Sequence, residues 1–352
     1  MRAMQSDYMH WAKTRAPVAF PLGSSEVAHF RMDRWEIDPA QLELDGASYH
    51  RYPPLRAAIA AKEGVAPECV VMADGTSMAN MLAMAALIEP GDVVLAESPA
   101  YEPMVTVAAH LGAEVRRFTR QAPEFAIDPD ALQGPCKLIL LTNLHNPTGN
   151  LADEATLRAV GTFAERWNAH VLVDEVYLDA AATPQRSAAT LGPRFVVTSS
   201  LTKVYGLSGL RCGWILAEPA LAERIWRLNE LFGVAQAHQA ERLACLALAR
   251  LDEVAAGTPA LLARNRALAN AFFARRDEIE MAPMRHGITA FPRLLSGNVD
   301  GLNDRLRAHY DCSIVPGHFF GLADHFRIGV GQPTEIVKEG LARLGAALDE
   351  FA

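Results

Sequence analysis

Short apolar runs alternate with longer helix-like stretches through the first two thirds of the chain, and this alternation constrains the fold most. Several runs are apolar throughout, as strands buried on both faces must be. The intervening stretches include Ser77–Leu87 and Glu154–Trp167. The alternation predicts an α/β fold with a mostly parallel seven-stranded sheet between helices. The expected strands are Cys69–Ala73, Val93–Ala96, Glu114–Phe118, Lys137–Thr142, His170–Asp174, Phe195–Ser199 and Trp214–Ala217.

The pattern changes after about residue 220, where helices come first and a few short strands follow. This order is typical of a second, smaller α+β domain. We expect residues 30–250 to form the large domain, and residues 1–29 with 251–352 to form the small one. The expected helices are Leu221–Phe232, Gln239–Leu251, Thr258–Glu280 and Thr334–Leu348, and the expected strands are Gly287–Leu294, Cys312–Val315 and His325–Val330. The first thirty residues are expected to be irregular.

Composition excludes several classes of protein. Half of the 352 residues are hydrophobic and the net charge is −8, so no basic field favours nucleic acid or an anionic membrane. The five cysteines are scattered and none lies in a Cys-x-x-Cys pair, which argues against a metal site and a disulfide framework. No signal peptide and no run of about eighteen apolar residues is present. We therefore expect a cytoplasmic protein with no nucleic-acid partner and no membrane span.

Candidate site residues lie in loops that follow the expected strands, where ligands bind in open α/β sheets. Asp74-Gly75-Thr76-Ser77 opens a helix, and a helix N-terminus with small residues suits a phosphate. An ordinary N-cap by Thr76 or Ser77 explains the same residues. Asp174 closes an apolar strand, where a carboxylate is costly unless it meets a cation.

Lys203 lies in the most distinctive segment, residues 199–213, and is the only lysine between Lys137 and Lys338. Small and apolar neighbours lower the pKa of an amine, which can then act as nucleophile and base. Arg211 and nearby hydroxyl groups suit a phosphate ester. Other polar residues after strands are Tyr101, Asn146 and Tyr177.

These segments together resemble the class I/II aminotransferases of fold type I, which depend on pyridoxal 5′-phosphate (PLP). The resemblance covers about residues 45–335, and it rests on the segment around Lys203 and on the stretches Asn146-Pro147-Thr148-Gly149 and Asp174-Glu175-Val176-Tyr177. Residues 315–321 and 326–329 resemble the closing segments of the family. Arg51-Tyr52-Pro53 resembles the histidinol-phosphate aminotransferase branch.

The resemblance implies a role for each matching residue. Lys203 carries the cofactor and moves the proton, Asp174 pairs with the ring nitrogen, and Tyr101 stacks on the ring. Asn146 and Tyr177 contact the ring hydroxyl oxygen. The phosphate is held by Gly75, Thr76, Ser77, Ser200, Thr202 and Arg211. The substrate carboxylate is bound by Arg327, with Asn146 and Gly23. A homodimer is implied, in which Tyr52, favoured over Tyr49, reaches the phosphate of the neighbouring subunit.

The implied activity is transfer of an amino group between an L-amino acid and a 2-oxo acid by a ping-pong mechanism. A decarboxylase or lyase on the same scaffold is the first alternative, because fold does not decide which bond is cleaved. A non-catalytic PLP-binding module, as in regulators fused to a DNA-binding domain, is more remote, because the segment before residue 45 carries no basic cluster. His145, His286 and His318 are expected to be structural, and Arg293 to form a surface salt bridge rather than read a substrate anion.

Overall fold

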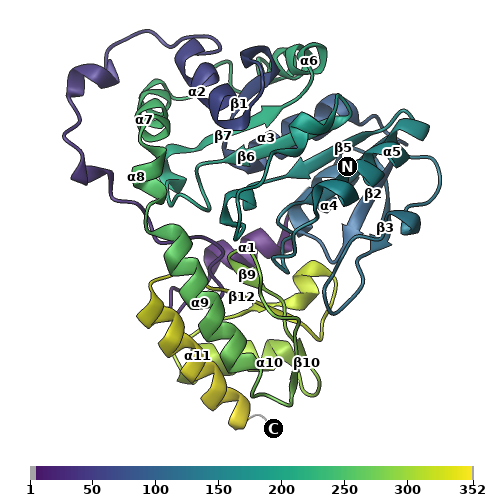
Figure 1. Ribbon diagram of the computed structural model, residues 1–352, viewed down its shortest axis with the longest axis vertical. Helices are drawn as coiled ribbons and strands as arrows, with labels where there is room; N and C mark the ends of the chain where they lie inside the picture. The colour runs from purple at the N-terminus through teal and green to yellow at the C-terminus, as the bar shows by residue number, and fades with distance from the viewer. Residues whose placement is uncertain (1–4, 351–352) are drawn as a thin grey trace.

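The structure is a computed structural model that describes residues 5–350. Its centre is a seven-stranded sheet in the order β1-β7-β6-β5-β4-β2-β3. Only β7 runs antiparallel to its neighbours, which are β1 and β6. The predicted α/β fold with a mostly parallel sheet is confirmed (Figure 1). The strands are β1 (Val70–Asp74), β2 (Val93–Ser98), β3 (Glu114–Thr119), β4 (Leu138–Thr142), β5 (His170–Asp174), β6 (Phe195–Ser200) and β7 (Cys212–Leu216).

Helices pack against this sheet because its central strands are apolar on both faces. Every residue of β4, β6 and β7 is buried, so both faces need a covering layer. For example, α3 packs on β6 and β7, and α5 packs on β5. The helices of this part are α2 (Pro53–Glu63), α3 (Gly75–Leu87), α4 (Glu102–His110), α5 (Glu154–Arg166), α6 (Pro219–Asn229), α7 (His238–Ala249) and α8 (Leu251–Ala255).

A second group of elements, drawn in green and yellow, lies at the other end of the molecule (Figure 1). Two small sheets have the orders β11-β12-β9 and β10-β8. The strands are β8 (Ile279–Glu280), β9 (Thr289–Ala290), β10 (Arg293–Leu294), β11 (Val315–Pro316) and β12 (Phe326–Gly329), and the helices are α9 (Thr258–Phe273), α10 (Val299–His309) and α11 (Thr334–Asp349). The expected division into domains near residue 250 stays a prediction.

The helix expected over 258–280 is too long, because α9 ends at Phe273. The charged residues 275–278 offer no apolar face on which a helix could continue to pack. Ile279 is instead buried as a strand residue paired with Leu294. The helical expectation therefore fails where a long-range strand pair competes with the local pattern.

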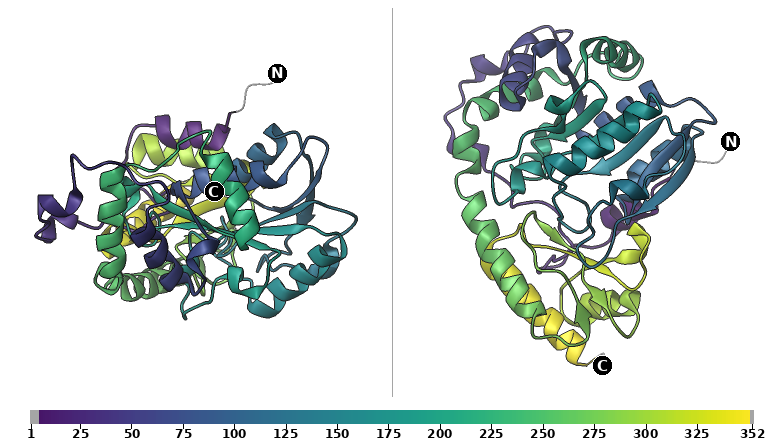
Figure 2. Two further views of the ribbon diagram at one scale, coloured as in Figure 1. Left: turned by 90° about the horizontal axis from the view of Figure 1, so that it is seen from above. Right: turned by 45° about the vertical axis from the view of Figure 1, so that its right-hand side comes forward.

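The first thirty residues are not wholly irregular, because they contain helix α1 (Asp7–Thr14). The Ser6 side chain accepts a hydrogen bond from the Met9 N–H at 3.0 Å, which caps the helix. Figures 1 and 2 show α1 at the junction between the large sheet and the second group of elements. This placement brings an N-terminal helix close to the carboxyl ends of several strands.

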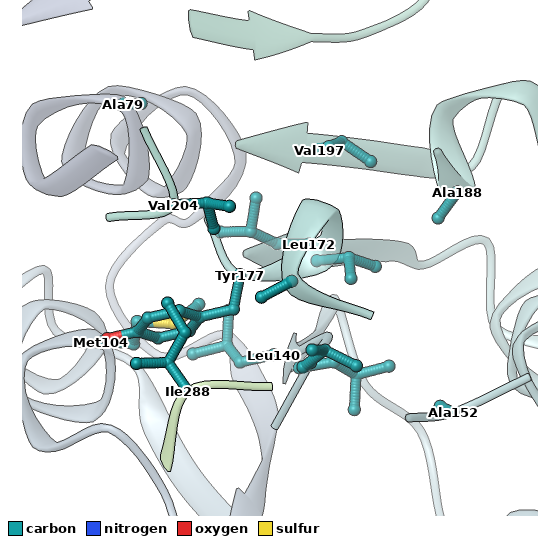
Figure 3. Close-up of a cluster of buried hydrophobic side chains, with 14 of the residues drawn as sticks. Ala79, Met104, Leu140, Ala152, Leu172, Tyr177, Ala188, Val197, Val204 and Ile288 are labelled. Atoms are coloured by element: carbon teal, nitrogen blue, oxygen red, sulfur yellow. The ribbon is translucent and has the colours of Figure 1, made fainter. Parts of the chain in front are cut away.

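One extended apolar cluster forms the core. Figure 3 shows part of it, with Tyr177 among buried side chains such as Leu140 and Leu172. None of the helices in the described range 5–350 is long and apolar enough to cross a membrane.

Candidate active site

A pocket of about 540 Å³ opens beside α1, where the strand ends meet the second group of elements. Its walls combine residues from widely separated parts of the chain. Eleven of the fourteen residues predicted from the sequence line it: Gly23, Thr76, Ser77, Tyr101, Asn146, Asp174, Tyr177, Thr202, Lys203, Arg211 and Arg327. The structure thus brings together most of the expected site, while the role of each residue remains a prediction.

One end of the pocket is built to hold an anion. Helix α3 begins at Gly75, and its N-cap residue Asp74 makes no side-chain capping bond. The Thr76 hydroxyl is bonded to Ser200 instead, and neither it nor Ser77 accepts a bond from a first-turn N–H group. These N–H groups carry the positive end of the helix dipole. Gly75 has φ 78°, and a Cβ there would collide with the Arg211 guanidinium. Only glycine lets this cation lie so close to the helix start.

Hydroxyl groups complete the same end of the pocket. Thr76 Oγ1 donates to Ser200 Oγ at 2.8 Å, so Ser200 lies directly behind the lining. The Arg211 guanidinium donates to the Asp74 carbonyl oxygen at 2.9 Å, which fixes its direction. A cation, hydroxyls and free backbone N–H groups are the donors that a phosphate monoester requires.

Asp174 supplies a buried carboxylate deeper in the pocket. Its oxygens accept hydrogen bonds from Asn80 Nδ2 at 2.8 Å and from the Val176 N–H at 3.0 Å. Burial nevertheless raises the pKa of Asp174 to about 6. No basic residue within the described range pairs with it at ion-pair distance, so this carboxylate would be stabilised by a cationic ligand.

Lys203 lies in the loop after β6 and faces the pocket. Its Nζ is 3.5 Å from Glu26 Oε2. Burial raises the pKa of the nearby Tyr177 phenol, and the Lys203 charge opposes that change. An amine held among polar partners at the edge of an apolar core can act as nucleophile and base.

Arg327, on β12, is almost fully buried yet has only neutral partners. It donates to Asn146 Oδ1 at 3.0 Å, to the Tyr8 hydroxyl at 2.9 Å and to the Gly23 carbonyl at 3.3 Å. Its Nε has no partner within residues 5–350, and no carboxylate there pairs with it. A buried guanidinium without an anion is a ready receptor for a ligand carboxylate.

Tyr52 is the one predicted residue that lies away from this pocket. The Arg242 guanidinium stacks on its ring at 3.9 Å.

Arg293, which could have bound an anionic group on the substrate side chain, instead pairs with Asp324 at 2.7 Å. His145 is fully buried and bonded to Thr148 Oγ1 at 2.7 Å, and burial lowers its pKa well below the usual range, so it is structural.

Sequence reasoning gave no role to several polar residues of the pocket, among them Tyr8, Glu26 and Asn80. Asn80 had a detectable signal, since it is a polar residue within an otherwise apolar helix. Tyr8, on the short helix α1, and Glu26, in the extended segment after it, had none, because a single polar residue forms no pattern in the sequence.

Comparison with known proteins agrees with this geometry. The family model for aminotransferase class I and II matches residues 24–344. The chain belongs to the class I and II aminotransferase family. Members of this family depend on PLP, so the cofactor of this aminotransferase is PLP, and the donor set of the pocket fits it at three points. The anion end suits the phosphate, Asp174 suits a protonated ring nitrogen, and Lys203 suits the aldehyde.

Several individual relatives extend along nearly the whole aminotransferase chain. Capreomycidine synthase of Streptomyces vinaceus is 32% identical over an alignment of 342 residues, and the match covers 90% of this chain and 86% of the relative. Histidinol-phosphate aminotransferase of Symbiobacterium thermophilum is 30% identical over an alignment of 323 residues, and the match covers 86% of this chain and 84% of the relative. The solved structure of a PLP-dependent cyclase, OrfR, has a TM-score of 0.90 at 25% identity and covers 100% of this chain and 99% of that one.

Proposed function

We propose that this enzyme moves the amino group of an L-amino acid to a 2-oxo acid in two half-reactions, with Lys203 as the residue that carries the cofactor and transfers the proton. One observation carries the proposal. An uncompensated buried guanidinium (Arg327), an acid in need of a cation (Asp174) and an accessible amine (Lys203) line a single pocket. These are the groups needed for a substrate carboxylate, a pyridinium nitrogen and a Schiff base.

Bound PLP supplies an electron sink for the charge left when a bond to the substrate α-carbon breaks. Arg327 binds the α-carboxylate as a fork and thereby orients the α-carbon. Lys203, once its amine is free, takes the α-proton and would deliver it to the cofactor carbon that binds the substrate nitrogen. Asp174 holds a positive charge at the ring nitrogen, and Asn80 keeps that carboxylate in place.

The test is an absorbance spectrum of the purified protein, with PLP bound, during titration with single L-amino acids and no oxo acid. Transamination predicts that the band of the lysine-bound cofactor gives way to the band of its aminated form. Addition of a 2-oxo acid then restores the first band. Ammonia or carbon dioxide released while the first band persists would contradict the proposal and support a lyase or decarboxylase.

A cyclase is the second candidate function, because capreomycidine synthase and the OrfR structure match this chain over nearly its full length. Cyclisation of an amino acid involves no net amino transfer and therefore needs no oxo acid. The same titration distinguishes the two candidate functions when the products are identified by mass spectrometry. A ring-closed product with the cofactor unchanged supports the cyclase, whereas an oxo acid supports transamination.

The substrate of the histidinol-phosphate branch carries a phosphate, and among the described residues few cationic side chains are free to bind it. The two arginines that could bind that phosphate, Arg51 and Arg293, are both paired with carboxylates. Arg51 donates to Glu223 at 2.9 Å, and Arg293 donates to Asp324 at 2.7 Å. We therefore favour an amino donor without a phosphate.

A homodimer is also part of the proposal. Exposed apolar side chains lie in the segment before α2 and in the loop between α6 and α7. Gln239, at the start of α7, donates to the Leu44 carbonyl at 3.3 Å and so links the first segment to the helix that follows this loop. Figure 1 shows the first segment standing away from the body of the molecule. Such a patch is typical of a buried interface, and a second copy is its natural partner. The side chains are Leu44, Tyr49, Leu231, Phe232 and Val234, each more than half exposed.

We further propose that Tyr52, which lies beside this patch, reaches the phosphate site of the second subunit. Stacking against Arg242 holds the Tyr52 ring in place at the surface. The cytoplasmic location and the domain boundary near residue 250 are likewise proposals that rest on the sequence.

A further inference from the structure

The segment from Glu26 to Phe30 is fixed between two parts of the active site. The Val27 N–H donates to the Lys203 carbonyl at 3.0 Å, on the lysine loop. On the other side, Gln332 Nε2 donates to the Glu26 carbonyl at 3.0 Å, in the segment that follows β12. Gly331 permits this approach, because a Cβ there would lie 2.5 Å from the Glu26 carbonyl oxygen. The backbone of Glu26 is therefore held from both sides.

This anchoring aims the Glu26 side chain at the lysine. Glu26 Oε2 and Lys203 Nζ are 3.5 Å apart, and their side chains are 28% and 30% exposed. Within residues 5–350 neither group has another ion-pair partner at this distance. Glu26 and Lys203 are thus paired with each other alone among the described residues, although water can reach part of both side chains.

Glu26 has no role among the contacts proposed for the cofactor and the substrate. Three other charged residues of the pocket have a proposed role: Arg211 at the phosphate, Asp174 at the ring nitrogen and Arg327 at the substrate carboxylate. Glu26 is the remaining acid in the pocket lining. Its only described ionic partner is the amine that must alternate between bound and free states.

We propose that Glu26 is a positioning residue for Lys203: its carboxylate holds the lysine ammonium whenever the amine is not bound to the cofactor, and so sets where and how tightly the proton is kept. The inference rests on the proposed role of Lys203. It concerns the free lysine, and so it is independent of whether the reaction is transamination or cyclisation.

The groups that face Lys203 act in opposite directions. Burial and the Arg327 guanidinium favour the neutral amine, whereas Tyr177, Glu26 and Tyr8 favour the ammonium. The net effect is a raised pKa of Lys203, so the lowered pKa expected from the sequence is wrong for the free amine. No cofactor contact is assigned to Glu26, so its substitution leaves the groups proposed to bind PLP in place. Loss of its charge should release the proton more easily.

The test measures the free amine directly. The protein is loaded with pyridoxamine 5′-phosphate, which has no aldehyde and leaves Lys203 unmodified. Trace labelling with acetic anhydride across a pH series, read by mass spectrometry of the Lys203 peptide, gives the midpoint of amine deprotonation. In Glu26→Gln the midpoint should fall by about one pH unit, so that Lys203 is labelled about ten-fold faster below both midpoints. Glu26→Asp, which keeps the charge, should restore most of the wild-type midpoint.

Glu36→Gln is the matched control, because Glu36 is an exposed acid in the same N-terminal segment and should leave the midpoint unchanged. An unchanged midpoint in Glu26→Gln, in a variant that retains the wild-type circular dichroism spectrum, would overturn the inference. A loss of rate confined to cationic amino donors, with the midpoint unchanged, would also overturn the inference, because Glu26 would then bind the substrate side chain. A failure of Lys203→Ala to abolish turnover would instead count against the proposed function.

Discussion

Asn80 donates a hydrogen bond from Nδ2 to Oδ2 of Asp174 at 2.8 Å, although the two residues are 94 positions apart in the chain. Asn80 in turn accepts a bond from Thr198 Oγ1 at 2.6 Å. The carboxylate that faces the pocket is therefore oriented by a side chain on α3, which also supplies the anion-binding helix start. One helix thus positions groups at both ends of the proposed cofactor.

Asn80→Ala should weaken binding of the cofactor. The variant removes one donor from a buried carboxylate, which costs about 1.4 kcal/mol or ten-fold in affinity. Fluorescence titration of the cofactor-free protein with PLP measures this effect. Thr198→Val is the control, since it removes only the bond behind Asn80 and should have a smaller effect. Equal affinity in wild type and Asn80→Ala would show that Asp174 does not need this support.

Lys203→Ala should lower turnover by about 10³-fold or more while the protein stays folded, because the residue is both nucleophile and base. The covalent cofactor band should disappear, although PLP still binds through its phosphate. Steady-state assays and reduction with borohydride followed by mass spectrometry check both points. Lys338→Ala, at an exposed lysine of α11, should behave as wild type.

Arg327→Lys should raise the KM for the amino acid more than it lowers kcat. Lysine keeps the charge but loses the fork that binds both carboxylate oxygens. Loss of one charge-assisted bond predicts about a ten- to hundred-fold rise in KM. Arg293→Lys, at the surface pair with Asp324, is the matched control. A normal KM in Arg327→Lys would place the carboxylate site elsewhere.

Glu175→Gln should remove part of the pH dependence of stability. Burial raises the pKa of Glu175 from 4.5 to about 8. An acid with a higher pKa in the folded chain binds more protons there than in the unfolded chain. Its contribution to stability is therefore greatest below pH 4.5 and decreases until about pH 8.

At pH 8 the neutral glutamine should therefore make the protein more stable than wild type. At about 1.4 kcal/mol per pKa unit, the difference has an upper limit of roughly 4 kcal/mol. Denaturant unfolding at pH 5 and pH 8 measures it. Glu165→Gln, at an exposed acid of α5, should leave the change in the free energy of unfolding between pH 5 and pH 8 as in wild type. A wild-type change in Glu175→Gln would refute the prediction.

Phe232→Asp should weaken the proposed homodimer by ten-fold or more, because it would place an unpaired charge in a buried interface. Analytical ultracentrifugation distinguishes a single chain of 38.2 kDa from an assembly of twice that mass. Leu295→Asp changes another exposed apolar residue outside the patch and should not affect assembly. A monomeric wild-type protein would contradict the homodimer directly.

The sequence by itself determined the α/β fold, the strands of the large sheet close to their observed ends, and the loops that carry Asp174, Asn146 and Lys203. The strand expected over Gly287–Leu294 is instead two short strands, β9 and β10, in different sheets. Apolar runs, turn residues and helix starts are local features, and local features leave a periodic or compositional mark on the chain. Their order along the chain also carried the family resemblance. The end of α9 at Phe273 escaped this reasoning, because the pairing of Ile279 with Leu294 depends on a distant strand.

Only the tertiary structure decided which isolated polar residues join the site. Tyr8 reaches Arg327 across 319 positions of sequence. Glu26 reaches Lys203 because its carbonyl accepts a bond from Gln332, after β12, and the next residue, Val27, donates to the Lys203 carbonyl. Neither residue repeats, caps or alternates with others in a way that a sequence displays. Their positions follow from how α1 and the extended segment behind it fold back over the sheet, and such long-range packing is a property of the whole chain.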